Sequence, residues 1–407
     1  MTFTDQTQFD ALRPGAGFEV LSNPEFLSEG QAIENLKRPD RILIGCDQTL
    51  RGRRAAASLV KVYAHWVPRN KILCTNVWSS ELSKLVANAM LAQRISSINS
   101  VSEICERTGA DVHEVAKAIG LDQRIGPQFL KAGLGFGGSC FRKDIASLVY
   151  LARSLGLEDV ANYWNHVNLI NESQRNRFAR NVVTRLNTTL FNKKVVLLGF
   201  AFKKNTGDPR ESLAVDVIKV LRDEMPTEIA IFDPGCNPAS IQKEVDQIYV
   251  KGDGYNREVV QTYTDAYAAC HDADAIMIIT DWDLFKNAPA KGTFRPAKSL
   301  PAPDPAAVAG LAKLPPPAVA SYESSAPHPT QFVAEPACPS GCPECLTPTV
   351  DVDFNTDERL DWERVGSHMK EPRWVFDGRA VLNVATMEKL GFRVEALGVS
   401  SSSSAFF

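Results

Sequence analysis

Residues 193–203, KKVVLLGFAFK, open the part of the chain that decides the fold. An amphipathic pattern follows at 212–225 (SLAVDVIKVLRDEM), and further apolar runs follow at 228–234 (EIAIFDP) and 273–280 (ADAIMIIT). Strand-like apolar runs rich in β-branched residues, separated by a helical pattern, are typical of a parallel sheet buried on both faces. We therefore predict a Rossmann-like α/β domain, although it lacks a complete G-x-G-x-x-G fingerprint.

A shorter α/β unit is predicted upstream of this domain, at 17–75. Three strand-like runs, FEVLSN, RILIGC and KILCTN, occupy 18–23, 41–46 and 71–76, and an amphipathic helix is predicted over 53–67. The segment NPEFLSEG suggests a further short helix, with Asn23 as its N-cap, Pro24 at its first position and Gly30 after its end.

Between the two α/β units the pattern is helical. Residues 79–109 contain no proline and only a terminal glycine, so they predict one long helix that joins two domains. Asp111 and Glu114 form a capping-box pattern for a helix at 111–120, and further helices are predicted at 143–156 and 158–187.

The rest of the chain differs in character. Residues 287–356 are rich in Pro and Ala and show no sustained period, which favours a disordered insertion before regular sequence resumes with WVFDGRAVLN and GFRVEALG. The predicted organisation is a disordered lead (1–16), an α/β unit (17–75), a helical domain (76–187), an α/β domain (188–286 and 373–398), a mainly disordered insertion (287–372) and a tail (399–407).

Composition excludes several classes of partner. The 45 Lys and Arg residues nearly balance 48 Asp and Glu residues, so no nucleic-acid or membrane-surface partner is expected. No apolar run is long enough to span a bilayer, and the first residues lack the apolar core of a signal peptide. We therefore expect a soluble cytoplasmic protein.

Nine scattered cysteines argue against a disulfide framework. Cys338, Cys342 and Cys345 in CPSGCPEC resemble half of a zinc site, but no fourth ligand is obvious, since His328 and His368 are the nearest histidines. We therefore expect a flexible loop with free thiols rather than a metal site.

The stretch GLGFGGSCFRKD at 133–144 carries the clearest chemical signal. Its glycines allow a ligand to approach the backbone closely. Cys140 follows them at the expected start of a helix and precedes Arg142 and Lys143, and both features favour the nucleophilic thiolate. Asp144 lies one turn further on the same face. The alternative is a small apolar cysteine buried behind a tight turn.

Five motifs in order resemble one family. NPEFLSEG, SSELSKLVANAMLAQRISSINS, the GFGGSC block, GFAFKKNTGDPRES and FDGR are together similar to the UDP-glucose 6-dehydrogenases. The resemblance implies two-step oxidation of UDP-glucose to UDP-glucuronate with NAD. It also implies an NAD-binding domain at the N-terminus, a central helical dimerisation domain, a C-terminal UDP-binding domain and a homo-oligomer of at least two chains.

The resemblance also implies catalytic roles. Cys140 attacks the intermediate aldehyde, which allows hydride loss from a thiohemiacetal and hydrolysis of the resulting thioester. Lys84, which shares a helix face with Asn88, stabilises the oxyanion or relays a proton, and Asp144 holds a water molecule and supports Lys84. Glu25 acts as general base for the hydrolysis. Without the evidence of the motifs, Lys84 would be interpreted as a solvated helix residue, and Asp144 and Glu25 as ordinary acidic residues near helix termini.

The implied binding residues form two groups. Residues 131–137 would surround the sugar nucleotide through backbone N–H groups, and Arg124 would reach the neighbouring subunit's substrate. The implied substrate site contains Glu25, Phe26, Leu27, Ser28, Glu29, Lys84, Asn88, Arg124, Lys131, Leu134, Gly135, Phe136, Gly137, Phe202, Lys203 and Arg379. The implied cofactor site contains Glu29, Cys140, Lys143 and Arg210, and no metal ligands are expected.

The sequence departs from the family at its start. Only 17 residues precede Phe18, and they contain no G-x-G-x-x-G turn. We therefore expect the unit at 17–75 to be a remnant of the NAD-binding domain, most of which is missing. This predicts a chain that alone binds NAD weakly or not at all and is inactive, with strands such as RILIGC left without sheet partners. The alternatives are a non-catalytic UDP-sugar-binding dimerisation module, or a UDP-N-acetyl-hexosamine or GDP-mannose dehydrogenase.

Overall fold

The computed structural model describes residues 18–248, 259–287 and 359–399. The described residues all belong to one compact unit of the chain. The predictions made for the lead at 1–16, for Cys338, Cys342 and Cys345, for most of the insertion and for residues 400–407 of the tail concern parts of the chain outside these ranges.

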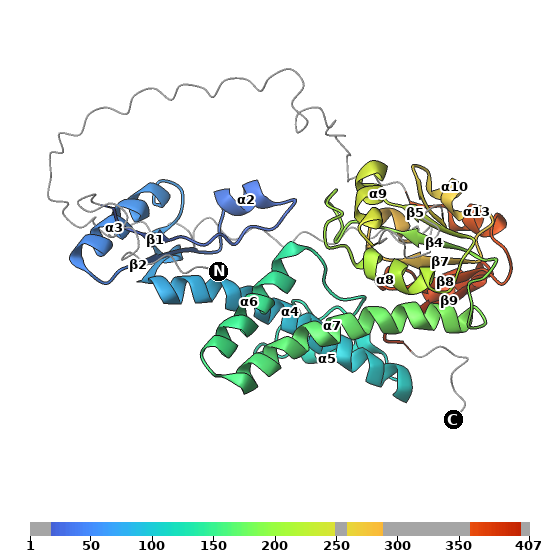
Figure 1. The fold of residues 1–407 in the computed structure, drawn as a ribbon, viewed down its shortest axis with the longest axis horizontal. Helices are drawn as coiled ribbons and strands as arrows, with labels where there is room; N and C mark the ends of the chain where they lie inside the picture. Colours follow the sequence, from blue (N-terminus) through green and yellow to red (C-terminus); the bar gives the residue numbers. More distant parts are fainter. Residues whose placement is uncertain (1–17, 249–258, 288–358, 400–407) are drawn as a thin grey trace, which may run out of the picture. The chain divides into compact units, whose positions relative to one another are not determined.

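The C-terminal α/β domain is built on a six-stranded sheet in the order β6-β5-β4-β7-β8-β9, and all neighbouring pairs are parallel (Figure 1). The central strands are almost entirely buried, as their uninterrupted apolar sequences predict. This confirms the predicted parallel sheet. The strands are β4 (Lys194–Leu198), β5 (Glu228–Phe232), β6 (Val260–Tyr263), β7 (Ala275–Ile278), β8 (Trp374–Asp377) and β9 (Arg393–Ala396).

Short helices connect these strands, and most begin with a side-chain cap. Ser212, Asn237, Asp265 and Asn383 each accept a backbone N–H of the following helix. These caps fix where the helices leave the sheet. The elements are α8 (Leu213–Arg222), α9 (Pro238–Asp246), α10 (Ala266–Cys270), the 3-10 turn η3 (Asp283–Phe285), α13 (Trp362–Ser367) and α14 (Val384–Lys389).

Helix α13 corrects the predicted end of the insertion at residue 372. Asp361 caps this helix, and the Trp362 indole is buried and donates a hydrogen bond to the Phe285 carbonyl (3.1 Å). Val365 and Met369 are buried in the same core. Residues 359–372 therefore belong to the α/β domain, because their apolar side chains fill its core.

The N-terminal unit contains a three-stranded sheet in the order β1-β2-β3. The prediction that RILIGC lacks sheet partners is wrong, because β2 pairs antiparallel with β1 and parallel with β3. Helix α3 begins three residues earlier than predicted, because Thr49 provides its N-cap. The elements are β1 (Leu21–Ser22), β2 (Ile42–Cys46), α3 (Leu50–Tyr63), the 3-10 turn η1 (Arg69–Lys71) and β3 (Ile72–Asn76).

The helix predicted over NPEFLSEG is also wrong. Residues 23–28 are irregular, and a helix, α2 (Ala32–Lys37), begins only after the turn at Gly30, which has φ +81°. Asn23 does not cap a helix; its side chain donates to the Leu43 carbonyl (2.8 Å) and accepts from the Tyr63 hydroxyl (2.7 Å). These tertiary bonds hold the segment in an open conformation against β2 and α3.

The helical domain agrees closely with the sequence analysis. One uninterrupted helix, α4 (Val77–Thr108), ends at Gly109, which adopts a left-handed conformation (φ +80°). Asp111 caps α5 (Val112–Gly120), although it accepts the N–H of His113 and not that of Glu114. The remaining helices are α6 (Ser139–Ser154), which begins four residues earlier than predicted, and α7 (Glu158–Arg185).

Two further expectations concern the whole chain. Within the described ranges, no helix combines the length and the apolar character needed to cross a membrane. The six cysteines in the same ranges are all free, as expected for a chain without a disulfide framework.

Candidate active site

Cys140 lies in the first turn of α6 and is exposed. The preceding Gly138 takes φ +79°, and its N–H donates to the Glu211 carbonyl (3.1 Å). A Cβ atom at this position would lie only 2.8 Å from the Phe202 ring, so only glycine fits between the ring and the turn. The glycine sequence therefore allows the chain to pass Phe202 and start the helix that carries Cys140.

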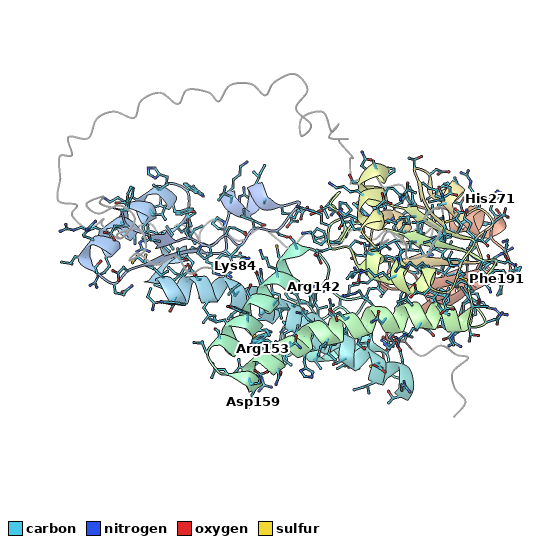
Figure 2. All side chains as sticks on the ribbon, in the orientation of Figure 1. Lys84, Arg142, Arg153, Asp159, Phe191 and His271 are labelled. Carbon is cyan, nitrogen blue, oxygen red and sulfur yellow. The ribbon has the colours of Figure 1, made fainter. Side chains whose placement is uncertain are left out.

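Asp144 anchors a polar cluster one turn below Cys140. Its carboxylate is 1% exposed, and Oδ2 accepts hydrogen bonds from Lys84 Nζ (2.8 Å) and Asn88 Nδ2 (2.6 Å). Lys84, labelled in Figure 2, and Asn88 are four residues apart on α4, so their side chains reach the same carboxylate oxygen. The structure thus brings Lys84 and Asn88 of α4 together with Asp144 of α6, the helix that carries Cys140.

The glycine loop, residues 133–138, is held by the end of strand β8. The Leu134 N–H donates to the Gly378 carbonyl (3.0 Å), and Arg379 donates from Nη1 to the Gly135 carbonyl (3.0 Å). Arg379 also donates from Nε to the Ile279 carbonyl (2.6 Å), and burial lowers the pKa of its guanidinium. FDGR therefore faces the glycine loop.

Three buried amide side chains that sequence reasoning missed also hold this loop. Asn171 bonds both backbone groups of Phe136, and Asn99 and Gln174 bond the N–H and carbonyl of Gly133. The sequence indicates shared helix faces, because Asn88 and Asn99 are three turns apart on one face of α4 and Asn171 and Gln174 share a face of α7. This spacing does not indicate which residues the amides contact.

A second set of predicted residues meets between the segment after β1 and the loop after β4. Lys203 Nζ donates to Ser28 Oγ (3.1 Å) and to the Glu29 carbonyl (2.8 Å). The Glu29 carboxylate accepts the Thr206 hydroxyl (2.9 Å). Phe202, adjacent to Lys203, packs against Gly138, so this set connects to the glycine loop.

Other predicted residues have separate local partners. Glu25 accepts the N–H of Leu27 (2.8 Å), and no hydrogen bond or ion pair joins it to Cys140 in the described ranges. Phe26 lies beneath the Arg41 guanidinium, 3.9 Å from the ring centroid. Their assignment to the substrate site stays a prediction.

The predicted basic residues at the outer part of the site are exposed. Arg124 forms a bidentate pair with Asp122, and this hydrogen bonding raises the pKa of the arginine and lowers that of the aspartate. Lys131 Nζ lies 3.6 Å from Asp281. Lys143 lies beside the Asp144 cluster, 3.9 Å from its second oxygen, and 65% of its side chain is exposed.

Arg210 is fixed in orientation although 69% of its side chain is exposed. Its Nε and Nη2 donate to the two carboxylate oxygens of Asp208. These bonds raise the pKa of Arg210, and they lower that of Asp208 against the opposing effect of burial. The guanidinium is therefore a permanently charged, oriented group at the surface.

A cavity of about 390 Å³ lies against the glycine loop, on the side of α7 and α8. Buried Arg175 lines it and pairs with Asp216 (2.9 Å), and burial lowers the pKa of this arginine. Arg142, two residues after Cys140 on α6 and labelled in Figure 2, lines the cavity too.

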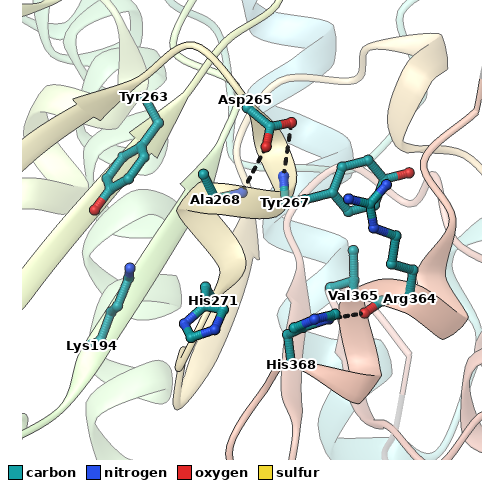
Figure 3. Close-up of a pocket in the computed structure, with 9 residues that line it drawn as sticks. All are labelled: Lys194, Tyr263, Asp265, Tyr267, Ala268, His271, Arg364, Val365 and His368. Atoms are coloured by element: carbon teal, nitrogen blue, oxygen red, sulfur yellow. Dashed lines mark hydrogen bonds between the residues drawn. The ribbon is translucent and has the colours of Figure 1, made fainter.

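A hollow of about 480 Å³ contains none of the predicted site residues. There Arg364 lies 3.9 Å from the centre of the Tyr267 ring, and Asp265 caps α10 (Figure 3). Its position in the C-terminal domain separates it from the loop and the thiol.

Three domain models of one family match the chain. The central domain of the UDP-glucose/GDP-mannose dehydrogenase family matches residues 78–173, its UDP-binding domain matches 196–300, and its NAD-binding domain matches 3–67. Part of the NAD-binding domain is therefore present, as expected for the N-terminal unit. The expectation that this chain alone binds NAD weakly stays a prediction.

Individual relatives of the chain are members of the same family. The chain is 43% identical to UDP-glucose 6-dehydrogenase of Bos taurus over 398 residues, which cover 97% of this chain and 66% of the relative. It is 39% identical to UDP-glucose 6-dehydrogenase 5 of Oryza sativa subsp. japonica, over 94% of this chain and 67% of the relative. The chain thus spans about two thirds of the length of these relatives.

A solved structure is similar as well. The UDP-glucose dehydrogenase of the archaeon Pyrobaculum islandicum matches with 36% identity and a TM-score of 0.57, over 66% of this chain and 57% of that chain.

Proposed function

The chain belongs to the UDP-glucose/GDP-mannose dehydrogenase family, and from this premise we propose that the protein oxidises UDP-glucose to UDP-glucuronate with NAD. One observation carries the proposal beyond family membership. An exposed thiol lies at the start of α6, and one turn below it Asp144 orients an ammonium and an amide from α4. This arrangement combines a nucleophile with groups that stabilise an oxyanion.

Each group has a defined task in the proposed reaction. After the first oxidation, the Cys140 thiolate adds to the aldehyde carbon, and the carbonyl oxygen becomes an oxyanion that Lys84 stabilises. Asp144 keeps Lys84 and Asn88 in place for this. Loss of hydride from the thiohemiacetal gives a thioester. Water then adds, Glu25 accepts one of its protons, and the C–S bond breaks to release the thiolate and the carboxylic acid, which loses the second proton to solvent.

A second part of the proposal concerns the predicted substrate residues. We propose that the N–H groups of the glycine loop bind the sugar and phosphates, and that Phe202, Lys203 and Arg379 hold the rest of the molecule. Arg379 is already oriented toward the loop by its bond to Gly135. The remaining predicted residues, Phe26 to Glu29, Lys131 and Leu134 to Gly137, would complete the site.

The exposed cations fit a dinucleotide phosphate. Arg210 is oriented by Asp208 and solvent-facing, and Lys143 is exposed beside Cys140. We propose that these two residues, with Glu29, hold NAD. When bound, NAD supplies the hydride acceptor for both oxidations.

The assembly and location belong to the same proposal. Arg124 is 89% exposed on its side chain, so it is free to reach a neighbouring subunit of a homo-oligomer. A reactive thiol that must remain reduced suits the cytoplasm.

Two measurements test the proposed function. Calorimetric titration with UDP-glucose tests the sugar-nucleotide half, and NADH absorbance with UDP-glucose and NAD tests the oxidation half. The proposal expects UDP-glucose binding and two NADH per UDP-glucuronate, with NADH formation reduced by roughly three orders of magnitude in Cys140→Ser. Absence of UDP-glucose binding contradicts the proposal. Binding of UDP-glucose without binding of NAD would instead indicate a non-catalytic UDP-sugar-binding module.

A further inference from the structure

We infer that Asn171, with Asn99 and Gln174, is a positioning residue for the glycine loop and for Cys140. These three side chains, called the amide clamp below, come from α4 and α7. The inference rests on the proposed function for its consequence, because the loop is there the substrate-binding segment. The geometry itself is independent of that function.

The clamp engages the backbone and not the side chains of the loop. Asn171 accepts the Phe136 N–H at Oδ1 (2.9 Å) and donates from Nδ2 to the Phe136 carbonyl (2.9 Å). Asn99 Oδ1 accepts the Gly133 N–H (2.9 Å), and Gln174 Nε2 donates to the Gly133 carbonyl (3.0 Å). Both backbone groups of two loop residues are therefore fixed by side chains.

Because the three amide side chains are buried, the loss of one of their hydrogen bonds is energetically costly. Asn171 is 4% exposed, and Asn99 and Gln174 are buried to a similar degree. Removing one partner would leave buried backbone groups without hydrogen bonds. Asn99 also keeps its Nδ2 buried without a partner in the described ranges, which a side chain selected only for stability would avoid. This cost favours a role in shaping the loop.

Gly135 and Asn171 fit each other closely. Gly135 adopts φ +102°, and a Cβ atom there would lie 2.0 Å from Asn171 Oδ1. The amide thus occupies the space that any other residue at 135 would need. The glycine and the asparagine act as one unit, which explains why the loop requires glycine at this point.

The clamp and its neighbours leave a specific set of donors free. Leu134 donates to Gly378, Phe136 to Asn171, and Gly138 to Glu211. By contrast, the N–H groups of Gly135 and Gly137 donate to no acceptor in the part of the chain that the structure describes. Fixing the alternate residues leaves both donors for an anionic or hydroxyl-bearing ligand. Gly137 is half-buried and lines the neighbouring cavity, whereas Gly135 is buried. The loop leads directly into α6, so the clamp also sets the position of Cys140.

The test compares Asn171→Ala with a matched control on the same helix. Asn168 is three residues earlier, lines the neighbouring cavity and makes no side-chain hydrogen bond to the loop, so Asn168→Ala removes the same chemical group without touching the clamp. Three properties of the full chain are measured for both variants. They are amide hydrogen exchange of peptides covering 133–138, the dissociation constant for UDP-glucose, and the thermal unfolding midpoint.

The inference predicts faster exchange in the loop and roughly tenfold or greater weakening of UDP-glucose binding in Asn171→Ala, with wild-type behaviour in Asn168→Ala. Loop exchange and UDP-glucose affinity within twofold of wild type in Asn171→Ala would overturn it. If Asn171→Ala does not fold, Asn171→Asp keeps the shape but removes the donor to the Phe136 carbonyl, and the same criteria apply. Failure of the wild-type chain to bind UDP-glucose would contradict the proposed function, while the exchange data alone would still decide whether the clamp fixes the loop.

Discussion

Asp144 is the residue whose burial most constrains the chemistry beside Cys140. A carboxylate that is almost fully buried must be paired, and here Lys84 and Asn88 supply both partners. The exposed thiol above it has a different environment within one helical turn. The buried ion pair and the exposed thiol therefore lie within one helical turn of each other.

Removing the carboxylate should destabilise the fold as well as the proposed chemistry. Asp144→Ala leaves the Lys84 ammonium, which is 16% exposed, without its ion-pair partner. We expect the free energy of unfolding, measured with urea, to fall by about 3–5 kcal/mol. The control Arg153→Ala removes the exposed pair with Glu158 and should change it by about 0–1 kcal/mol. Equal losses in the two variants would show that Asp144 is not a buried anchor.

Much of this site could be predicted at the level of residue identity. Residue spacing indicates that Lys84 shares a helix face with Asn88, and Cys140 with Asp144. The structure adds that Lys84 and Asn88 both donate to the Asp144 carboxylate. Asn171 could not be assigned in the same way. Its role depends on a contact 35 residues away in sequence, which local periodicity does not encode.

At the scale of elements, Gly109 at the end of α4 and Gly135 in the glycine loop are required for different reasons. Gly109 provides only a left-handed conformation at the end of α4, and a Cβ there meets nothing within 4 Å. Gly135 provides the conformation and also the space that Asn171 fills. A comparison of substitutions at the two positions therefore distinguishes the effect of backbone strain from that of steric exclusion.

This difference predicts unequal effects of the same substitution. Gly109→Ala should lower the free energy of unfolding by about 1–2 kcal/mol through backbone strain alone. Gly135→Ala should cost more, because the new methyl group must displace the Asn171 amide from Phe136. Thermal and urea unfolding of the two variants measures this. A cost at Gly135 no larger than at Gly109 would contradict the steric argument.

Strands and long helices were predictable because their signals are local. Strands β2 and β7 are apolar throughout, β4 and β5 are apolar after their first residue, and α4 contains no helix breaker. The helix predicted at 23–30 failed because Asn23 bonds Leu43 and Tyr63 instead of capping. Helix α13 was missed because its apolar residues follow a long Pro- and Ala-rich segment and are ordered by the core they enter.

At the scale of the whole molecule, stability at high pH should depend on groups buried in the α/β domain. Burial raises the pKa of Cys270 to about 12, and burial together with a hydrogen bond to Glu228 raises the pKa of Tyr263 to about 12. Each raised pKa means that the folded state holds its proton after the unfolded chain has lost it. The resulting stabilisation is complete below the unfolded pKa values and is lost as pH rises toward 12.

Tyr263→Phe tests this dependence. The variant loses one hydrogen bond and should be less stable by about 1 kcal/mol at pH 7. Between about pH 10 and 12 its unfolding free energy should fall less steeply than that of the wild-type chain, because one linked proton has been removed. The control Tyr150→Phe changes an exposed tyrosine and should follow the wild-type curve. Identical pH slopes for Tyr263→Phe and wild type would contradict the linkage.

The order of domains could be predicted from the sequence, since each domain begins with a distinct pattern. The relation between them could not, because it depends on contacts such as those of Lys203 with Ser28 and Glu29 and of Arg379 with Gly135. These contacts bring residues from all three parts of the chain to the glycine loop and its surroundings. They make the proposed substrate site a property of the assembled molecule.

The most direct test of this account is alkylation of the exposed cysteines with and without UDP-glucose, followed by mass spectrometry. Cys140 and Cys74 are both exposed, but only Cys140 lies at the end of the glycine loop, so Cys74 is an internal control. The account predicts that saturating UDP-glucose slows alkylation of Cys140 by roughly tenfold or more and leaves Cys74 unchanged. An unchanged rate at Cys140 would contradict the proposal that this loop and thiol form the sugar-nucleotide site.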